Sequence, residues 1–108
     1  MQEQSRQGDI FFEEVSAAPS RCKPKTDNIV AYGEVTGHCH KIMNPPLSEL
    51  DSLVDENGDI YVRSLDQPIE ICHDEHDPVM LSAGKWFCIT RQREYDPLAA
   101  DKERRVRD

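Results

Sequence analysis

Turn-forming residues interrupt this chain so often that only short secondary-structure elements fit between them. Proline, glycine, asparagine and aspartate cluster at intervals of about 8–12 residues, a spacing typical of all-β sandwiches and barrels. Asn57-Gly58, for example, is the dipeptide most typical of a two-residue β-hairpin turn. About six or seven stretches between the turns are rich in β-branched and aromatic residues. The pattern predicts an all-β fold, a small antiparallel barrel or sandwich.

The stretches between turns define the elements that we expect. Predicted strands span residues 9–15, 29–36, 38–43, 59–65, 69–73, 79–81 and 85–95. Leu47, Leu50 and Val54 recur at helical spacing, which predicts a short helical turn. Pro97, followed by Leu98, can begin a short C-terminal helix, because proline is well tolerated in the first turn of a helix.

The length of 108 residues leaves room for one domain with one modest core. We expect a flexible N-terminal segment over residues 1–8, a single β domain over 9–96, and a C-terminal helix or tail over 97–108. No apolar run approaches the ~20 residues that span a membrane as a helix. The polar N-terminus also lacks the apolar stretch of a secretion signal. These features predict a cytoplasmic protein without a membrane partner.

The net charge and the cysteine spacing argue against several common classes of protein. The formal net charge of −8 argues against a nucleic-acid backbone as the main partner. The four cysteines include no Cys-x-x-Cys pair, so the common zinc-ribbon spacing is absent, and nothing indicates the secreted setting of a disulfide framework. The sequence also lacks a phosphate-binding loop, a nucleophile elbow and a His-Glu-x-x-His motif.

All four histidines lie in two short clusters, His38-x-His40 and His73-x-x-His76. Residues two apart in a strand face the same side, so His38 and His40 can bind one ion. His73 continues a strand face, and a bend in the acidic turn that follows can bring His76 to the same site. Imidazole suits zinc, manganese, iron or nickel. The sequence therefore predicts one divalent metal ion held by the four histidines.

Further polar residues are candidates for the same pocket. Glu34 and Thr36 share the strand face of the first cluster, and Glu75 lies inside the second, where a carboxylate can ligate the metal or orient an imidazole. Arg91 and Arg93 share one strand face and can recognise the carboxylate or phosphate of a small-molecule ligand. The alternative for the two arginines is an exposed strand face paired with acidic neighbours.

Gly33 and the His38-x-His40 pair resemble the first metal-binding motif of cupins, in which an HxH pair on a strand supplies two ligands. His76 and the turn after it resemble the second half of such a barrel. The resemblance covers roughly residues 33–95 and implies a small β-barrel that holds a metal ion in its mouth. Cupins usually carry a glutamate shortly after the HxH pair, whereas this chain has methionine and asparagine there.

Other interpretations stay open. The histidines and nearby carboxylates can form a hydrogen-bonded turn network without a metal. A mixed Cys/His zinc site requires a β-bulge that turns Cys39 or Cys72 towards the histidines. A metal ion with an open coordination position would make the domain a metal-dependent enzyme. The alternative function is a non-catalytic structural or interaction module of an intracellular or phage-like assembly, including a homo-oligomer, and the sequence does not select between the two.

Overall fold

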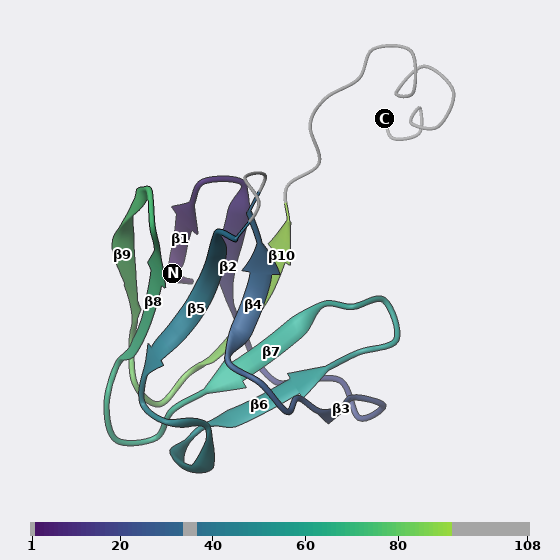
Figure 1. Ribbon diagram of the computed structural model, residues 1–108. Coiled ribbons are helices and arrows are strands. Elements are labelled where there is room, and N and C mark those ends of the chain that lie inside the picture. Colours follow the sequence, from purple (N-terminus) through teal and green to yellow (C-terminus); the bar gives the residue numbers. More distant parts are fainter. Residues whose placement is uncertain (1, 34–36, 92–108) are drawn as a thin grey trace.

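The computed structural model describes residues 2–33 and 37–91, which form ten β-strands and one short 3-10 turn (Figure 1). The strands are β1 (Gln4–Gln7), β2 (Ile10–Val15), β3 (Lys23–Pro24), β4 (Ile29–Tyr32), β5 (Cys39–Asn44), β6 (Asp51–Val54), β7 (Ile60–Arg63), β8 (Ile69–His73), β9 (His76–Leu81) and β10 (Trp86–Arg91). The 3-10 turn η1 (Leu47–Glu49) lies between β5 and β6. Within the described ranges no helix has the length and apolar character needed to cross a membrane.

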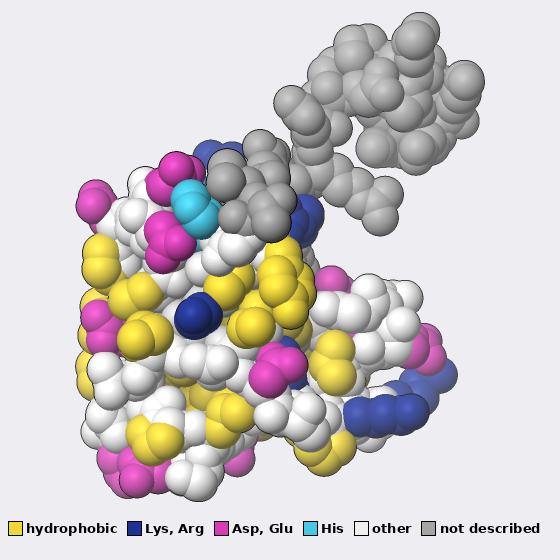
Figure 2. Space-filling view, viewed as in Figure 1, with side chains coloured by type: hydrophobic (Ala, Val, Ile, Leu, Met, Phe, Trp, Pro, Cys, Tyr) yellow, Lys and Arg dark blue, Asp and Glu magenta, His cyan; other side chains and the backbone are white. Residues whose placement is uncertain are grey.

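The strands form two antiparallel sheets. The larger sheet has the order β1-β2-β10-β7-β6-β3, and the smaller has the order β4-β5-β8-β9. Strands distant in sequence lie side by side, since β10 pairs with both β2 and β7, and β5 pairs with β8. Figure 1 shows the smaller sheet lying over the larger one, with β6 and β7 extending to one side. Figure 2 shows hydrophobic side chains on the outer surface of the smaller sheet as well.

One hydrophobic core lies between the two sheets. Side chains of a strand point alternately to its two faces, so Ile69 and Ile71 of β8 and Phe87 and Ile89 of β10 all face inward, each at most 3% exposed. Phe12 of β2 joins the same cluster. Burying a side chain of this size contributes about 1.5–3 kcal/mol. A shift of one residue in register would expose the whole inward set, so the alternation fixes the pairing of these strands.

The predicted all-β class is confirmed, in the form of two antiparallel sheets. Among residues 2–33 and 37–91 the strands do not close into a barrel. The predicted C-terminal helix lies outside the described residues, as do the parts of the predicted strands at residues 34–36 and beyond Arg91.

Two segments differ from the sequence prediction. The chain was expected to be flexible over residues 1–8, but Gln4–Gln7 form β1 and pair antiparallel with β2. The helical turn expected from Leu47 to Val54 is limited to η1, and the remainder forms β6, which pairs with β7. Cross-strand packing between β-branched residues, such as Val54 opposite Ile60, outweighs the helical spacing of the leucines.

Candidate functional site

The side chains of all four histidines meet at one end of the smaller sheet. His38 precedes β5 and His40 lies within it, whereas His73 ends β8 and His76 begins β9. Ring centroids are 4.3 Å apart for His40 and His73, 4.7 Å for His73 and His76, and 5.8 Å for His38 and His73. The structure therefore brings together the four histidines that the sequence analysis singled out.

A tight hairpin places His76 beside His73. Asp74 and Glu75 form a two-residue turn between β8 and β9, and the two histidines are register partners on either side of it. Directly opposite residues of an antiparallel pair present their side chains on the same face. His76 thus reaches the site across the β8–β9 ladder, through a bend in the acidic turn as the sequence predicted.

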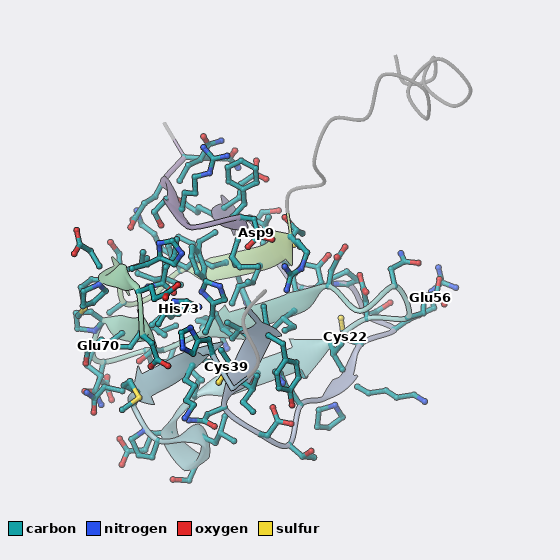
Figure 3. The ribbon with its side chains drawn as sticks, turned by 45° about the horizontal axis from the view of Figure 1, so that its top comes forward. Asp9, Cys22, Cys39, Glu56, Glu70 and His73 are labelled. Carbon is teal, nitrogen blue, oxygen red and sulfur yellow. The ribbon has the colours of Figure 1, made fainter. Side chains whose placement is uncertain are left out.

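The histidines line a pocket of about 270 Å³. The turn between β1 and β2, the residue after β4 and the β8–β9 turn supply its other walls, which comprise Gly8, Asp9, Gly33 and Glu75. Asp9 and His73, both labelled in Figure 3, line this pocket together. Pockets that bury a drug-sized ligand measure roughly 300–1,000 Å³. This pocket therefore suits an ion or a small molecule.

His40 has a defined proton position. Its Nδ1 lies 2.8 Å from Oε1 of Gln7, and the side-chain amide of Gln7 donates from Nε2 to the carbonyl oxygens of Ile71 and Asp77, at 2.9 and 2.8 Å. Because those two acceptors fix the nitrogen of the amide, the Gln7 oxygen can only accept. His40 must then donate from Nδ1–H, which leaves a lone pair on Nε2 in the neutral ring.

Burial keeps His40 neutral. The residue is 1% exposed, and desolvation together with the neighbouring His73 lowers its pKa from 6.5 to about 4, although Asp9 opposes the shift. At neutral pH the His40 ring therefore has a free lone pair, the form in which imidazole acts as a base or binds a metal.

Two glycines make room for the rings of His73 and His76. A Cβ atom at Gly33 would lie 2.9 Å from Nε2 of His73, and one at Gly8 would lie 2.8 Å from Nε2 of His76. Gly8 also has a φ of +62°, which side-chain-bearing residues rarely adopt. The opposite nitrogen of His73, Nδ1, accepts the backbone N–H of Glu75 at 3.0 Å. The two imidazoles are thus packed closely against backbone.

His38 lies at the acidic rim of the pocket. Its Nδ1 is buried, has no hydrogen-bond partner among the described residues, and lies 3.8 Å from Oε1 of Glu75. Its Nε2 lies 3.6 Å from Oδ2 of Asp74. A buried polar nitrogen without a partner costs about 1–3 kcal/mol. A ligand that gave this nitrogen a partner would remove that cost.

The rings are close together, but their nitrogens do not yet converge. In residues 2–33 and 37–91, no group of three or more His, Cys, Asp or Glu side chains is arranged to hold a metal ion as it stands. The contacts of His73 and His76 explain this, since their Nε2 atoms face Gly33 and Gly8. Cys39 precedes His40 within β5 and so lies on the other face of the strand, which removes support for Cys39 as a ligand beside His40.

The predicted arginine site takes a different form. Arg91 forms an ion pair with Asp9 and also donates to the carbonyl oxygen of Tyr32, so it links the β1–β2 turn to the end of β4. Arg91 thus follows the alternative stated for the two arginines, in which they pair with acidic neighbours. The remaining candidates, Glu34, Thr36 and Arg93, lie outside the described residues.

Sequence reasoning missed Gln7, which was assigned to the flexible N-terminal segment. A local signal for its strand existed, because Gly8-Asp9 is a dipeptide typical of a two-residue hairpin turn and directly precedes a strand pattern. No local signal indicates that the side chain of Gln7 reaches His40, 33 residues later.

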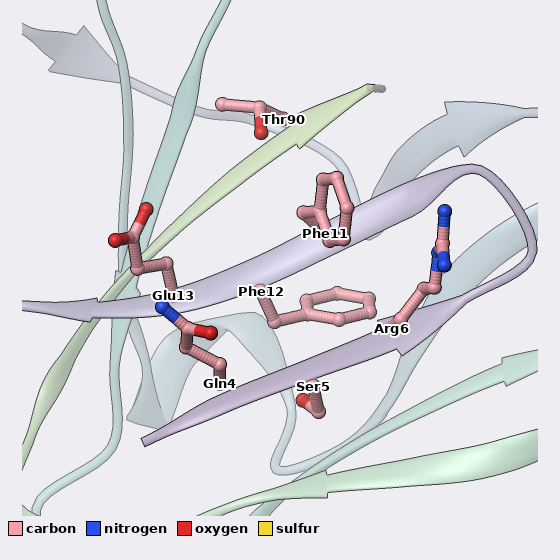
Figure 4. Close-up of a pocket in the computed structure, with 7 residues that line it drawn as sticks. All are labelled: Gln4, Ser5, Arg6, Phe11, Phe12, Glu13 and Thr90. Carbon is pink, nitrogen blue, oxygen red and sulfur yellow. The ribbon is translucent and has the colours of Figure 1, made fainter. Parts of the chain in front are cut away.

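A second hollow lies on β1, β2 and β10 and does not share this chemistry (Figure 4). Its volume is about 410 Å³, and its lining includes Arg6, Phe11 and Thr90. The Arg6 guanidinium carbon lies 4.8 Å from the centre of the Phe11 ring, a cation–π contact. The hollow contains no histidine or cysteine, so the histidine pocket is the better candidate site.

Comparison with known proteins gives one family. Neither the curated proteins nor the solved structures contain a match to this chain. A family model described as a domain of unknown function, DUF8820, matches residues 6–92, which include β2 to β10 and all four histidines. The chain therefore belongs to the DUF8820 family.

Proposed function

We propose that this protein binds one divalent transition-metal ion in the histidine pocket, with His38, His40, His73 and His76 as candidate ligands. The hydrogen-bonding state of His40 is the observation that carries the proposal. Histidines that bind metals usually donate their second ring N–H to an oxygen acceptor, which orients the ring. His40 donates from Nδ1 to Gln7 in this manner, and its lowered pKa leaves Nε2 unprotonated at neutral pH.

The other rings need side-chain rotations to complete such a site. Rotation about χ2 by 180° exchanges each ring nitrogen with a ring carbon, which redirects the nitrogen lone pairs, and this torsion is broad in histidine. For His73 it would break the hydrogen bond from the Glu75 backbone N–H, in an exposed turn. Such a bond contributes about 0.5–1.5 kcal/mol, whereas structural zinc sites bind with roughly 10–16 kcal/mol at neutral pH. Metal binding can therefore supply the energy for the rearrangement.

The donor set favours zinc, manganese, iron or nickel over calcium and magnesium, because imidazole nitrogen is a poor ligand for the latter two. Glu75 is near enough to His38 to orient it or to provide an oxygen donor. This use of an HxH pair is cupin-like, here in a domain of two open sheets. A bound ion would supply Lewis acidity to a small-molecule ligand if one coordination position stayed open.

The test is metal binding by the untagged full-length protein, by elemental analysis and by calorimetric titration with zinc, manganese, nickel and iron(II). We expect about one equivalent of metal. Ligand at about one hundred times Kd would stabilise the fold by about 2.7 kcal/mol. His76→Ala is the informative variant, because His76 is exposed and its loss should leave the metal-free fold intact.

A double variant, Cys39→Ser with Cys72→Ser, is the matched control, since thiols are the other side chains in β5 and β8 that bind such metals. It should bind metal as the wild type does. The proposal fails if the wild type binds none of the four metals, or if His76→Ala and His40→Ala bind them with unchanged affinity.

A further inference from the structure

The outer face of the smaller sheet breaks the usual alternation of an antiparallel sheet. Such a sheet normally packs one face on the core and exposes polar residues on the other. Here three of the four large hydrophobic side chains that are exposed among the described residues lie on this face: Tyr32 at 67%, Met43 at 53% and Met80 at 53%. Cys39, Ile29, Cys72 and Pro78 also belong to the outward set of β4, β5, β8 and β9.

Charge is scarce on this face, although charged residues make up 31% of the chain. In β4, β5 and β8, the charged members of the outward set are Lys41 and Glu70. The register places Lys41 opposite Cys72, two residues along β8 from Glu70. Figure 2 shows hydrophobic side chains gathered over these strands around one basic side chain. Surfaces rich in Met and aromatic residues but poor in Lys, Glu and Asp are typical of protein interfaces.

We propose that this face, which we name the outer β4–β9 face, binds the same face of a second copy of the chain. In a two-fold dimer the same patch of both copies forms the interface. If one residue contacts a second residue of the other copy, the symmetry repeats that contact with the copies exchanged. Lys41 and Glu70 lie on neighbouring strands and carry opposite charges, so they can form such a repeated contact when the two-fold axis runs between them. Lys41 of each copy then meets Glu70 of the other.

The contacts of Glu70 within one chain support this role. Its Oε1 accepts from the Asn44 side-chain amide at 2.8 Å, which holds the carboxylate on the outer face. A second copy matches this face better than an acidic or basic partner does, because the face is largely apolar and its strands β4, β5 and β8 carry one outward charge of each sign. Two sheets stacked in this way lie about 10 Å apart, a distance that the Lys41 and Glu70 side chains can span together.

A charge exchange tests the proposal, with self-association of the full-length protein measured by sedimentation velocity from micromolar to millimolar concentration. The wild type should form a dimer. Lys41→Glu and Glu70→Lys should each weaken it at least about tenfold, because each places like charges opposite one another. The double variant restores opposite charges and should return to within about threefold of the wild-type Kd.

Two matched controls separate the face from general effects of charge. Lys23→Glu makes the same charge change on β3, at an exposed position of the larger sheet. Met80→Asp and Leu65→Asp each place a charge at an exposed hydrophobic residue, but Leu65 lies between β7 and β8, outside the outer β4–β9 face. Lys23→Glu and Leu65→Asp should dimerise normally, whereas Met80→Asp should not.

Either of two results would overturn the proposal. A wild-type protein that stays monomeric over the whole range would leave the face to residues 92–108 of the same chain or to another protein. If the wild type dimerises but the double variant binds no more tightly than the single variants, Lys41 and Glu70 do not meet across the dimer interface. Thermal melting of every variant shows whether it is folded, so unfolding cannot be mistaken for lost association.

Discussion

Replacing Gln7 with methionine should destabilise this protein more than any other change of a polar residue in β1. Gln7 is 2% exposed and its side chain makes three hydrogen bonds, to His40 and to the carbonyl oxygens of Ile71 and Asp77. Methionine has a similar length and volume, so it fills the same space without making these bonds. The variant therefore removes polar contacts and leaves the packing nearly unchanged.

The magnitude follows from the partners that Gln7→Met leaves behind. The bonds to Ile71 and His40 are buried, and the bond to Asp77 is partly exposed. Each buried partner left unsatisfied costs about 1–3 kcal/mol, whereas water can partly replace the third bond. We expect a loss of about 3 kcal/mol, which lowers the melting temperature by roughly 12–24 °C in a domain of this size.

The assay is urea unfolding with the exposed variant Gln4→Met as the matched control. Gln4 lies on the same strand, and its replacement should change the free energy of unfolding by less than about 0.5 kcal/mol. Nitrogen NMR of the histidines adds a readout that stability alone does not give, because loss of Gln7 removes the acceptor that fixes the Nδ1–H form of His40. If Gln7→Met unfolds like Gln4→Met, or if wild-type His40 carries its proton on Nε2, the argument for His40 as a ready ligand is wrong.

The remaining predictions concern the pocket glycine, the buried histidine and the core. Gly33→Ala should weaken metal binding at least about tenfold, since the new Cβ would meet Nε2 of His73 at 2.9 Å and the Cβ and carbonyl oxygen of His38 at 3.3 Å; unchanged affinity in a calorimetric titration would contradict this. His40 has a pKa of about 4 in the fold and about 6.5 when unfolded. Between these values the unfolded chain binds more protons, so stability should fall as the pH drops from 6.5 to 4, by about 3 kcal/mol from this residue; unfolding of wild type and His40→Gln in urea across that range measures it, and equal slopes would refute it. Phe87→Ala should cost about 3–5 kcal/mol, because Phe87 is fully buried; a loss below about 1 kcal/mol in urea would show that the core is looser than described.

The fold class was predictable because the relevant signals are local. Alternation in β8 and β10 and the Asn57-Gly58 turn between β6 and β7 depend on neighbouring residues alone. The strand order was not predictable, since the β2–β10 and β5–β8 pairings join distant segments. Nothing in the local pattern distinguishes two open sheets from a closed barrel.

The candidate site was predictable in part for the same reason. The spacing of His38 and His40, and the clustering of His73 with His76, are local features that pointed to one pocket. Gln7 was missed because its role depends on the packing of β1 against β9, which brings the side-chain oxygen of Gln7 to His40 only in the folded chain. The orientation of the ring nitrogens is likewise a property of the packed pocket, in which Gly33 and Gly8 contact the rings.

The hydrogen bonds of Gln7 join the two sheets through a polar contact inside the domain. Gln7 belongs to the larger sheet, whereas His40 and Ile71 belong to the smaller. The position of β1 and the geometry of the histidine pocket therefore depend on each other. A truncation or a fusion that displaces β1 would break the hydrogen bond to His40 without removing any side chain of β8 or β10 from the apolar core. An affinity tag placed directly before β1 would therefore disturb the pocket under study.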